Sequence, residues 1–446
     1  MRKRNYKRMT LLVVILSLLL TLSPLTGMAA LGGNSTTDSS VELPTTGFED
    51  REGDGWTTLT EEAAFLEELA DKSERVTYSQ AGWSVEGHPI HLVRVGYPAP
   101  PSDADIAAGR NILIMGTPHG NEPAGREMTL KLMRDLAFTE DPELLEQMSD
   151  ATILFVPTPN PDGRKANTRG NAWGADNNRD HLNLNTPEGQ TVAKIMNQFR
   201  PDITVDAHER PSGSNPDIEF LWPRNLNVDD ELRDLNTEMV QDYVRPDVEA
   251  AGFSTGLYGS PGGSGSGDER ILRNTSGLRH GLGLLTESAG RETPTARVDM
   301  QMHAAESVLR FYRERFDDIE TVVTEAPQRK QAAGANQEAF YLEGTHGWDP
   351  SEYPPIELDP VPCGYLLHTE QAEAISRHIE LFSIETEQVS ENGVFVTMDQ
   401  PMMTVVPLLL DERAQYNEVD GLALPDCSDP GKVEPPTLPE QTEPAQ

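Results

Sequence analysis

A short loop, residues 116–123, carries an imidazole and a carboxylate three positions apart, at His119 and Glu122. If the backbone turns between them, both side chains can close on one metal ion. Zinc takes nitrogen and oxygen ligands of this kind at about 2.0–2.2 Å, and a catalytic zinc site keeps a fourth position for water. An apolar run at 112–115 precedes the loop, and a helical pattern begins near Gly125. We therefore expect His119 and Glu122 to form the first half of a zinc site.

The position of this pair matters more than its spacing. His303 and Glu306 repeat the spacing, but they fall within residues 296–316, whose apolar positions predict an amphipathic helix. A solvated or packed helix face is the better interpretation there. His119 instead follows a predicted buried strand and stands among Gly and Pro residues, where loops carry function in α/β folds.

Two more residues with metal-binding or acid–base side chains follow apolar strands. The predicted strand 203–207 leads into His208, and the predicted strand 283–286 leads into Glu287. In open α/β sheets, ligands bind beyond the carboxyl ends of the strands. We therefore expect His119, His208 and Glu287 to meet at one edge of a sheet.

A segment rich in Asn, Gly and Arg, residues 167–179, lies between these strands. Its Arg169 and Arg179 carry permanently charged guanidinium forks, which suit carboxylates and developing oxyanions. Each arginine could instead pair with one of the many carboxylates in the chain, so the composition alone leaves their roles open.

In this order, and with Gly82-x-Ser84-x-Glu86-Gly87 before them, these motifs resemble the zinc metallocarboxypeptidases of the carboxypeptidase A/B family over roughly residues 57–316. The resemblance implies one zinc ion per chain, held by His119, Glu122 and His208. It also implies that Glu287 is the general base that takes a proton from zinc-activated water.

The same resemblance assigns further roles. Arg169 would stabilise the oxyanion, Asn178 and Arg179 would grip the terminal carboxylate of the substrate, and Asp176 would fix the ring of His119. Tyr258 is the best match to the mobile tyrosine of the family. It precedes a loop rich in Gly and Ser, which is a candidate lid.

The hydrophobic periodicity predicts an α/β fold. Apolar strands alternate with helical patterns at 125–136, 186–200, 230–251 and 296–316, which favours a mixed, mostly parallel central sheet flanked by helices on both faces. We expect six segments: a signal peptide at 1–29, a linker at 30–56, a zinc carboxypeptidase domain at 57–325, a second linker at 326–339, a small β-rich C-terminal module at 340–428, and a disordered tail at 429–446. Residues 403–410 are a strand candidate within the module. Every catalytic candidate precedes the module, so we expect it to be dispensable for chemistry.

The first residues predict export. A basic start is followed by the short apolar run 11–22 and by the small-x-small pattern Gly27-Met28-Ala29, which together indicate a cleaved secretory signal. We expect a secreted or extracytoplasmic protein without stable membrane association after cleavage. The net charge of −37 disfavours nucleic acid as a partner and is typical of salt-tolerant proteins.

The chain has two cysteines, Cys363 and Cys427. Export to an oxidising space favours a disulfide between them, which would stabilise the fold by roughly 4 kcal/mol in the chain-entropy treatment.

Two alternatives to a peptide-cleaving carboxypeptidase stay open. One is a zinc hydrolase of cell-wall peptides, or a deacylase on the same fold; the other is a metal-free binding protein on this scaffold. The intact ligand set and Glu287 argue against the binding protein. Arg179 favours a substrate with a free carboxylate beside the cleaved bond.

Overall fold

A computed structural model describes residues 42–211, 216–260, 263 and 265–437. The described residues from Leu43 onward belong to one compact unit. The predicted signal peptide at 1–29 lies outside the described residues. Among the helices that the structure describes, none combines the length and the apolar character needed to cross a membrane.

The predicted mixed, mostly parallel sheet is confirmed. Eight strands lie in the order β1-β2-β4-β3-β5-β8-β6-β7. The central strands β4, β3, β5 and β8 are parallel, while β2 joins β4 and β6 joins β8 in antiparallel pairs. The strands are β1 (Val76–Trp83), β2 (Pro89–Val95), β3 (Arg110–Met115), β4 (Ala151–Val156), β5 (Ile203–Arg210), β6 (Ile218–Leu221), β7 (Thr255–Leu257) and β8 (Leu282–Ala289).

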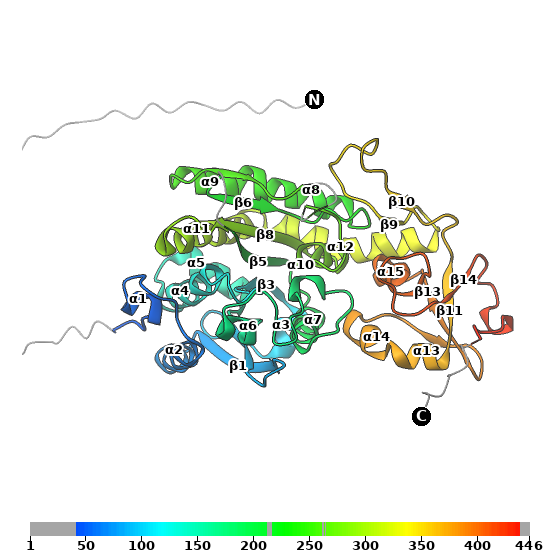
Figure 1. Ribbon diagram of the computed structural model, residues 1–446, viewed down its shortest axis with the longest axis horizontal. Coiled ribbons are helices and arrows are strands. Elements are labelled where there is room, and N and C mark those ends of the chain that lie inside the picture. The colour runs from blue at the N-terminus through cyan, green and yellow to red at the C-terminus, as the bar shows by residue number, and fades with distance from the viewer. Residues whose placement is uncertain (1–41, 212–215, 261–262, 264, 438–446) are drawn as a thin grey trace, which may run out of the picture. The chain divides into compact units, whose positions relative to one another are not determined.

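The central strands β3 and β4 are mostly apolar and buried because both faces of the sheet are covered. Along β3, Ile112 and Ile114 pack into one hydrophobic core, while Leu113 and Met115 pack into a second core on the opposite face. This alternation follows from the two-residue period of a strand. Helices α4 and α11 supply the first core and α7 supplies the second (Figure 1).

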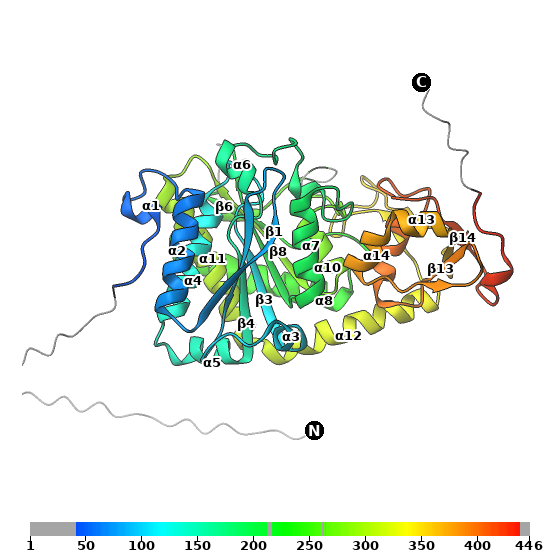
Figure 2. The same ribbon diagram turned by 90° about the horizontal axis from the view of Figure 1, so that it is seen from below.

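The helices of the sheet domain match the predicted periodicity within a few residues, since 125–136, 186–200 and 296–316 correspond to α4, α7 and α11. The pattern at 230–251 becomes α8 and α9 with the π-helical turn η2 between them. The helices are α1 (Gly47–Asp50), α2 (Leu59–Lys72), α3 (Asp103–Ala108), α4 (Ala124–Phe138), α5 (Pro142–Asp150), α6 (Pro161–Ala166), η1 (Asn177–Arg179), α7 (Pro187–Phe199), α8 (Asp230–Glu238), η2 (Met239–Val244), α9 (Arg245–Ala250), α10 (Leu272–Leu278), α11 (Pro294–Glu314) and α12 (Phe316–Ala335). Figure 2 shows α2, α5 and α7 from below.

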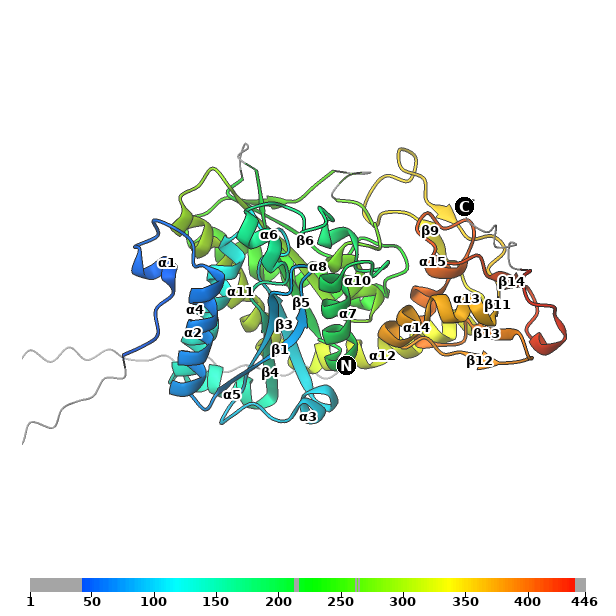
Figure 3. The same ribbon diagram turned by 60° about the horizontal axis from the view of Figure 1, so that its bottom comes forward.

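The C-terminal segment carries its own small antiparallel sheet in the order β12-β13-β11-β14. Figure 3 shows α12 leading from the large sheet toward these elements. They are β9 (Tyr341–Glu343), β10 (Ile356–Glu357), β11 (Gly364–His368), α13 (Thr369–Ala374), α14 (Ser376–Phe382), β12 (Glu387–Gln388), β13 (Gly393–Thr397), η3 (Pro401–Thr404), α15 (Val406–Leu410), β14 (Leu422–Leu424) and η4 (Pro430–Lys432).

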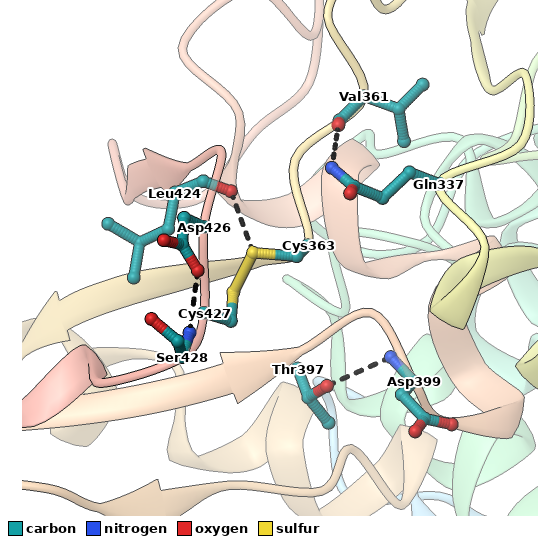
Figure 4. Close-up of a disulfide and its surroundings, with 9 residues drawn as sticks. All are labelled: Gln337, Val361, Cys363, Thr397, Asp399, Leu424, Asp426, Cys427 and Ser428. Carbon is teal, nitrogen blue, oxygen red and sulfur yellow. Dashed lines mark hydrogen bonds between the residues drawn. A yellow bond between two sulfur atoms is a disulfide. The ribbon is translucent and has the colours of Figure 1, made fainter.

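The two cysteines form the expected disulfide. Cys363 precedes β11 and Cys427 follows β14, and the bond between them ties the ends of these paired strands together (Figure 4). That residues 340–428 form a separate domain remains our proposal.

One local prediction is wrong, and the two expected linkers contain helices. The expected linker at 326–339 is mostly helix, because α12 continues to Ala335 and its alanines favour that conformation. The strand candidate at 403–410 is instead the end of η3 and the buried helix α15, since a short apolar run does not distinguish the two. Within the expected first linker, α1 forms with a capping box at Thr46, and its Phe48 is buried against Trp56.

Candidate active site

Three side chains converge where β3 and β5 end. The Nδ1 atom of His119 lies 2.9 Å from Oε1 of Glu122, and the Nδ1 atom of His208 lies 2.9 Å from Oε2 of the same carboxylate. The two Nδ1 atoms are 3.1 Å apart. Donors bound tetrahedrally to one zinc ion at 2.0–2.1 Å would lie roughly 3.3 Å from one another, so this trio fits the ion closely.

The loop between β3 and α4 reaches this geometry by packing directly on its neighbour. A Cβ atom at Gly120 would lie 1.8 Å from the carbonyl carbon of Gly163. Only glycine allows that approach, and it brings the loop onto the start of α6. His119 and Glu122 are thereby held on either side of the turn, and both are buried.

Each histidine has a carboxylate behind it. The Nε2 atom of His119 lies 2.9 Å from Asp176, and the Nε2 atom of His208 lies 2.9 Å from Asp206. A carboxylate at Nε2 favours the proton on that nitrogen, so Nδ1 can give up its hydrogen bond to Glu122 and present its lone pair to a metal ion. The donor chemistry therefore suits a metal ion at the Nδ1 side.

Glu122 is ionised in this setting. Burial acts to raise the pKa of its carboxyl, but the charges and hydrogen bonds of His119 and His208 outweigh burial and hold that pKa below its usual range. The backbone N–H of Glu209 donates to Oε2 of Glu122 at 3.1 Å. A charged, oriented carboxylate is what a zinc site requires from its oxygen ligand.

Glu287 stands beside the metal-binding trio. It is the register partner of His208 in the parallel pair β5 and β8, and its side chain is 5% exposed. Burial raises the pKa of Glu287 to about 7, although the charge of His208 acts in the opposite direction. Tyr258 donates a hydrogen bond to the Glu287 side chain. A buried carboxyl with a pKa near neutrality can both accept and return a proton.

Arg169 lies at the open side of the site, and about half of its side chain is exposed. Its Nε and Nη2 atoms donate to Oδ2 of Asp176 at 3.1 and 2.9 Å, and its Nη1 atom donates to Glu122 at 3.3 Å. Asp176 therefore holds Arg169 with one oxygen and His119 with the other.

The two predicted substrate-binding residues, Asn178 and Arg179, occupy different environments. Asn178 is buried, where its Nδ2 donates to Asp206 at 2.9 Å and its Oδ1 accepts from the backbone N–H of Leu272 at 2.9 Å. Arg179 is partly exposed, and its Nη1 donates to the backbone oxygen of Asn178 at 2.7 Å. Asn178 thus bonds to Asp206, the carboxylate that lies behind His208. The substrate-binding roles of Asn178 and Arg179 stay predictions.

Asp206 is a site residue that the sequence reasoning missed. It precedes His208 by two positions on β5, so both side chains point to the same face of the strand. The nearby charges of His208, His181 and His119 hold the pKa of Asp206 below its usual range in spite of burial. The Asp-x-His spacing within a predicted strand was the available signal.

The open, mostly parallel sheet carries a His, Glu, His donor set at its carboxyl edge, which is the ligand chemistry of a zinc site. Residues 62–222 match the family model described as zinc carboxypeptidase, Peptidase_M14. Residues 62–222 of this chain are thus similar to zinc carboxypeptidases, and His119, Glu122 and His208 form a group of side chains that fits a zinc ion.

Individual relatives agree with the family match. Carboxypeptidase 2 from Trichophyton rubrum is 28% identical over 296 residues, which cover 59% of this chain and 54% of that protein. Carboxypeptidase 2 from Trichophyton equinum is 31% identical over 248 residues, which cover 51% of this chain and 46% of that protein. The chain spans about half the length of these curated relatives. A solved metallo-carboxypeptidase from Pseudomonas aeruginosa, in complex with (2-guanidinoethylmercapto)succinic acid, has 21% identity, a TM-score of 0.48, and coverage of 58% of this chain and 69% of that chain.

Proposed function

We propose that this chain is a secreted zinc carboxypeptidase that removes C-terminal residues from peptides. The observation that supports the proposal most strongly is the closing of His119, Glu122 and His208 on one point beside the buried carboxyl of Glu287. A bound zinc ion supplies a polarised carbonyl and a water of lowered pKa at such a site.

The residues around the metal position have complementary roles in this proposal. Glu287 takes a proton on its carboxylate during attack and returns it to the leaving nitrogen, which its pKa of about 7 favours. Arg169 directs its guanidinium toward the oxygen on which negative charge develops, while Asp176 keeps that guanidinium in place. Tyr258 covers Glu287 and excludes water when substrate is bound.

Arg179 decides between an exopeptidase and other hydrolases. A guanidinium fork binds a terminal carboxylate through two charge-assisted hydrogen bonds, which fixes the scissile carbonyl relative to the metal. Asn178 shares this role in the proposal and also supports Asp206.

The test compares blocked dipeptides that have a free acid or an amide at the C-terminus, with cell-wall peptides and N-acyl amino acids in the same panel. We expect zinc at one ion per chain by elemental analysis, and a kcat/KM at least about 100-fold higher for the free acids, because the amide cannot pair with Arg179. Equal rates for acid and amide would contradict the exopeptidase function. Cleavage confined to cell-wall peptides or N-acyl amino acids would favour those alternatives.

A variant pair links this selectivity to one side chain. Arg179→Met should reduce the rate on free acids and leave little difference between acid and amide. Arg377→Met, at an exposed arginine of α14, is the matched control and should keep the selectivity of the unchanged protein.

We also propose that residues 1–29 direct export. A disulfide between Cys363 and Cys427 suits an oxidising extracellular compartment. Mass spectrometry of the protein recovered outside the producing cell should give an N-terminus at residue 30.

A further inference from the structure

One tyrosine of the C-terminal segment contacts an arginine beside the predicted substrate-binding residue Arg179. Tyr416, which follows α15, accepts a hydrogen bond at its hydroxyl from Nη2 of Arg270 at 2.7 Å. The guanidinium carbon of Arg270 also lies 3.4 Å from the centre of the Tyr416 ring. Stacking and a hydrogen bond together fix both the plane and the direction of the Arg270 guanidinium.

Arg270 in turn binds the carboxylate nearest to Arg179. Its Nε and Nη2 atoms donate to the two oxygens of Asp268 at 3.1 and 2.9 Å, and its backbone N–H donates to Oδ1 at 2.9 Å. Asp268 and Arg179 come no closer than 3.8 Å, which is beyond a hydrogen bond. The hydrogen bonds of Asp268 thus go to Arg270, and its contact with Arg179 is a loose ion pair without a hydrogen bond.

The loop that carries Arg179 also forms hydrogen bonds with Arg270 and with the C-terminal segment. The backbone N–H of His181 donates to the backbone oxygen of Arg270 at 3.2 Å. Asn183 donates to the backbone oxygen of Tyr416 at 3.0 Å and to the carboxylate of Glu418 at 2.6 Å. These contacts hold the loop after Arg179, here called the substrate loop, between residues 266–271 and the C-terminal segment.

We propose that Tyr416 is a positioning residue for carboxylate recognition. By holding Arg270 on Asp268, it keeps the Asp268 carboxylate from forming hydrogen bonds with the Arg179 guanidinium. This inference rests on the proposed function, in which Arg179 binds the terminal carboxylate of the substrate. It replaces our expectation that the C-terminal module is dispensable, because the module then contributes to substrate selection without touching the substrate.

Loss of Tyr416 has a definite electrostatic consequence. Arg270 would be free to turn toward solvent, and Asp268 would then approach Arg179 across the present gap of 3.8 Å. Direct hydrogen bonds between them would replace the present loose ion pair and compete with the substrate carboxylate for the same guanidinium fork. The zinc donors and Glu287 would be unchanged, so the loss should fall on KM for free acids and much less on kcat.

The first test uses the full-length zinc-loaded protein and its best free-acid dipeptide. Tyr416→Ala should raise KM by about tenfold, equivalent to one charge-assisted interaction, and lower the acid-to-amide selectivity by a similar factor. Tyr416→Phe keeps the ring and should show about a third of the effect on a logarithmic scale. Tyr365→Phe is the matched control, because it removes a hydroxyl bonded to Asp411 in the same module, away from the substrate loop.

A double variant separates positioning from general damage. If Asp268 captures Arg179, then Asp268→Asn in the Tyr416→Ala background removes the competing charge and should return KM to within about threefold of the unchanged protein. Damage to the fold would not be rescued in this way. Unchanged KM in Tyr416→Ala, or no rescue by Asp268→Asn, would overturn the proposal.

A third measurement does not depend on turnover. Hydrogen exchange of the His181 amide reports on the contact between the loop and Arg270, because this amide donates to the backbone oxygen of Arg270. Exchange should be faster in Tyr416→Ala than in Tyr365→Phe. If the unchanged protein cleaves no peptide, the proposed function fails, and this exchange still decides the positioning role: equal exchange rates in the two variants would refute it.

Discussion

Asp206 and His208 form a pair on one face of β5, with Oδ2 of Asp206 2.9 Å from Nε2 of His208. This contact directs the other ring nitrogen, Nδ1, toward Glu122. The orientation of the zinc ligand therefore depends on a residue that does not itself reach the metal.

Asp206→Asn should weaken zinc binding by about 10- to 100-fold, because the amide no longer stabilises the required tautomer of His208. Competition with a chelator, read as zinc retained per chain, measures the change. Asp202→Asn is the control near the start of β5, where the carboxylate bonds Tyr312 and Arg110. Equal zinc retention in both variants would remove Asp206 from the metal site.

Glu287→Gln should keep zinc and lose about 10²- to 10⁴-fold in kcat, since the amide cannot accept a proton. His208→Ala should lose zinc and activity together. Elemental analysis beside steady-state kinetics distinguishes the two outcomes. Near-normal turnover in Glu287→Gln would require another base.

The pH profile should report the same carboxyl. The base must be deprotonated, so kcat/KM should rise with pH through the pKa of Glu287, which burial raises to about 7, and level off above that pKa. Bound zinc favours the charged carboxylate, so the midpoint should lie between about 4.5 and 7. A rate that still climbs steeply above pH 8 would contradict this assignment.

Glu269 should make the fold less stable as the pH rises. Burial raises its pKa from 4.5 to about 7, so its favourable contribution is fully present below pH 4.5 and is lost as the pH rises through 7. Glu269→Gln should therefore narrow the difference in unfolding free energy between pH 5 and pH 8 by up to about 3 kcal/mol. Urea unfolding at both pH values measures this, with Glu67→Gln on the exposed side of α2 as the control. An unchanged difference would show that Glu269 titrates normally.

The donors of the zinc site could be predicted because the chemistry of parallel sheets is local in sequence. His119, His208 and Glu287 each lie at or just beyond the end of an apolar run, and the carboxyl ends of β3, β5 and β8 meet at one edge of the sheet. Their positions after apolar runs predicted that these side chains meet, and the resemblance of the motifs to the zinc metallocarboxypeptidases implied which of them bind zinc.

The remaining features depend on contacts that periodicity does not encode. Tyr416 and Arg270 are 146 positions apart, and no pattern in either segment indicates that they meet. The helix α15 was mistaken for a strand because its short apolar run is buried on all sides, where the two periods look alike. Tertiary packing decided both.

The Cys363–Cys427 bond also has a consequence for a protein exposed to other peptidases. Tyr416 lies within the covalent loop that this bond closes. A single cut before Tyr416 leaves it attached through Cys427, and a single cut after it leaves it attached through the main chain. No one nick in the loop can therefore release the tyrosine that lies against Arg270, and the protein should retain its substrate selectivity in a clipped form until the disulfide is reduced.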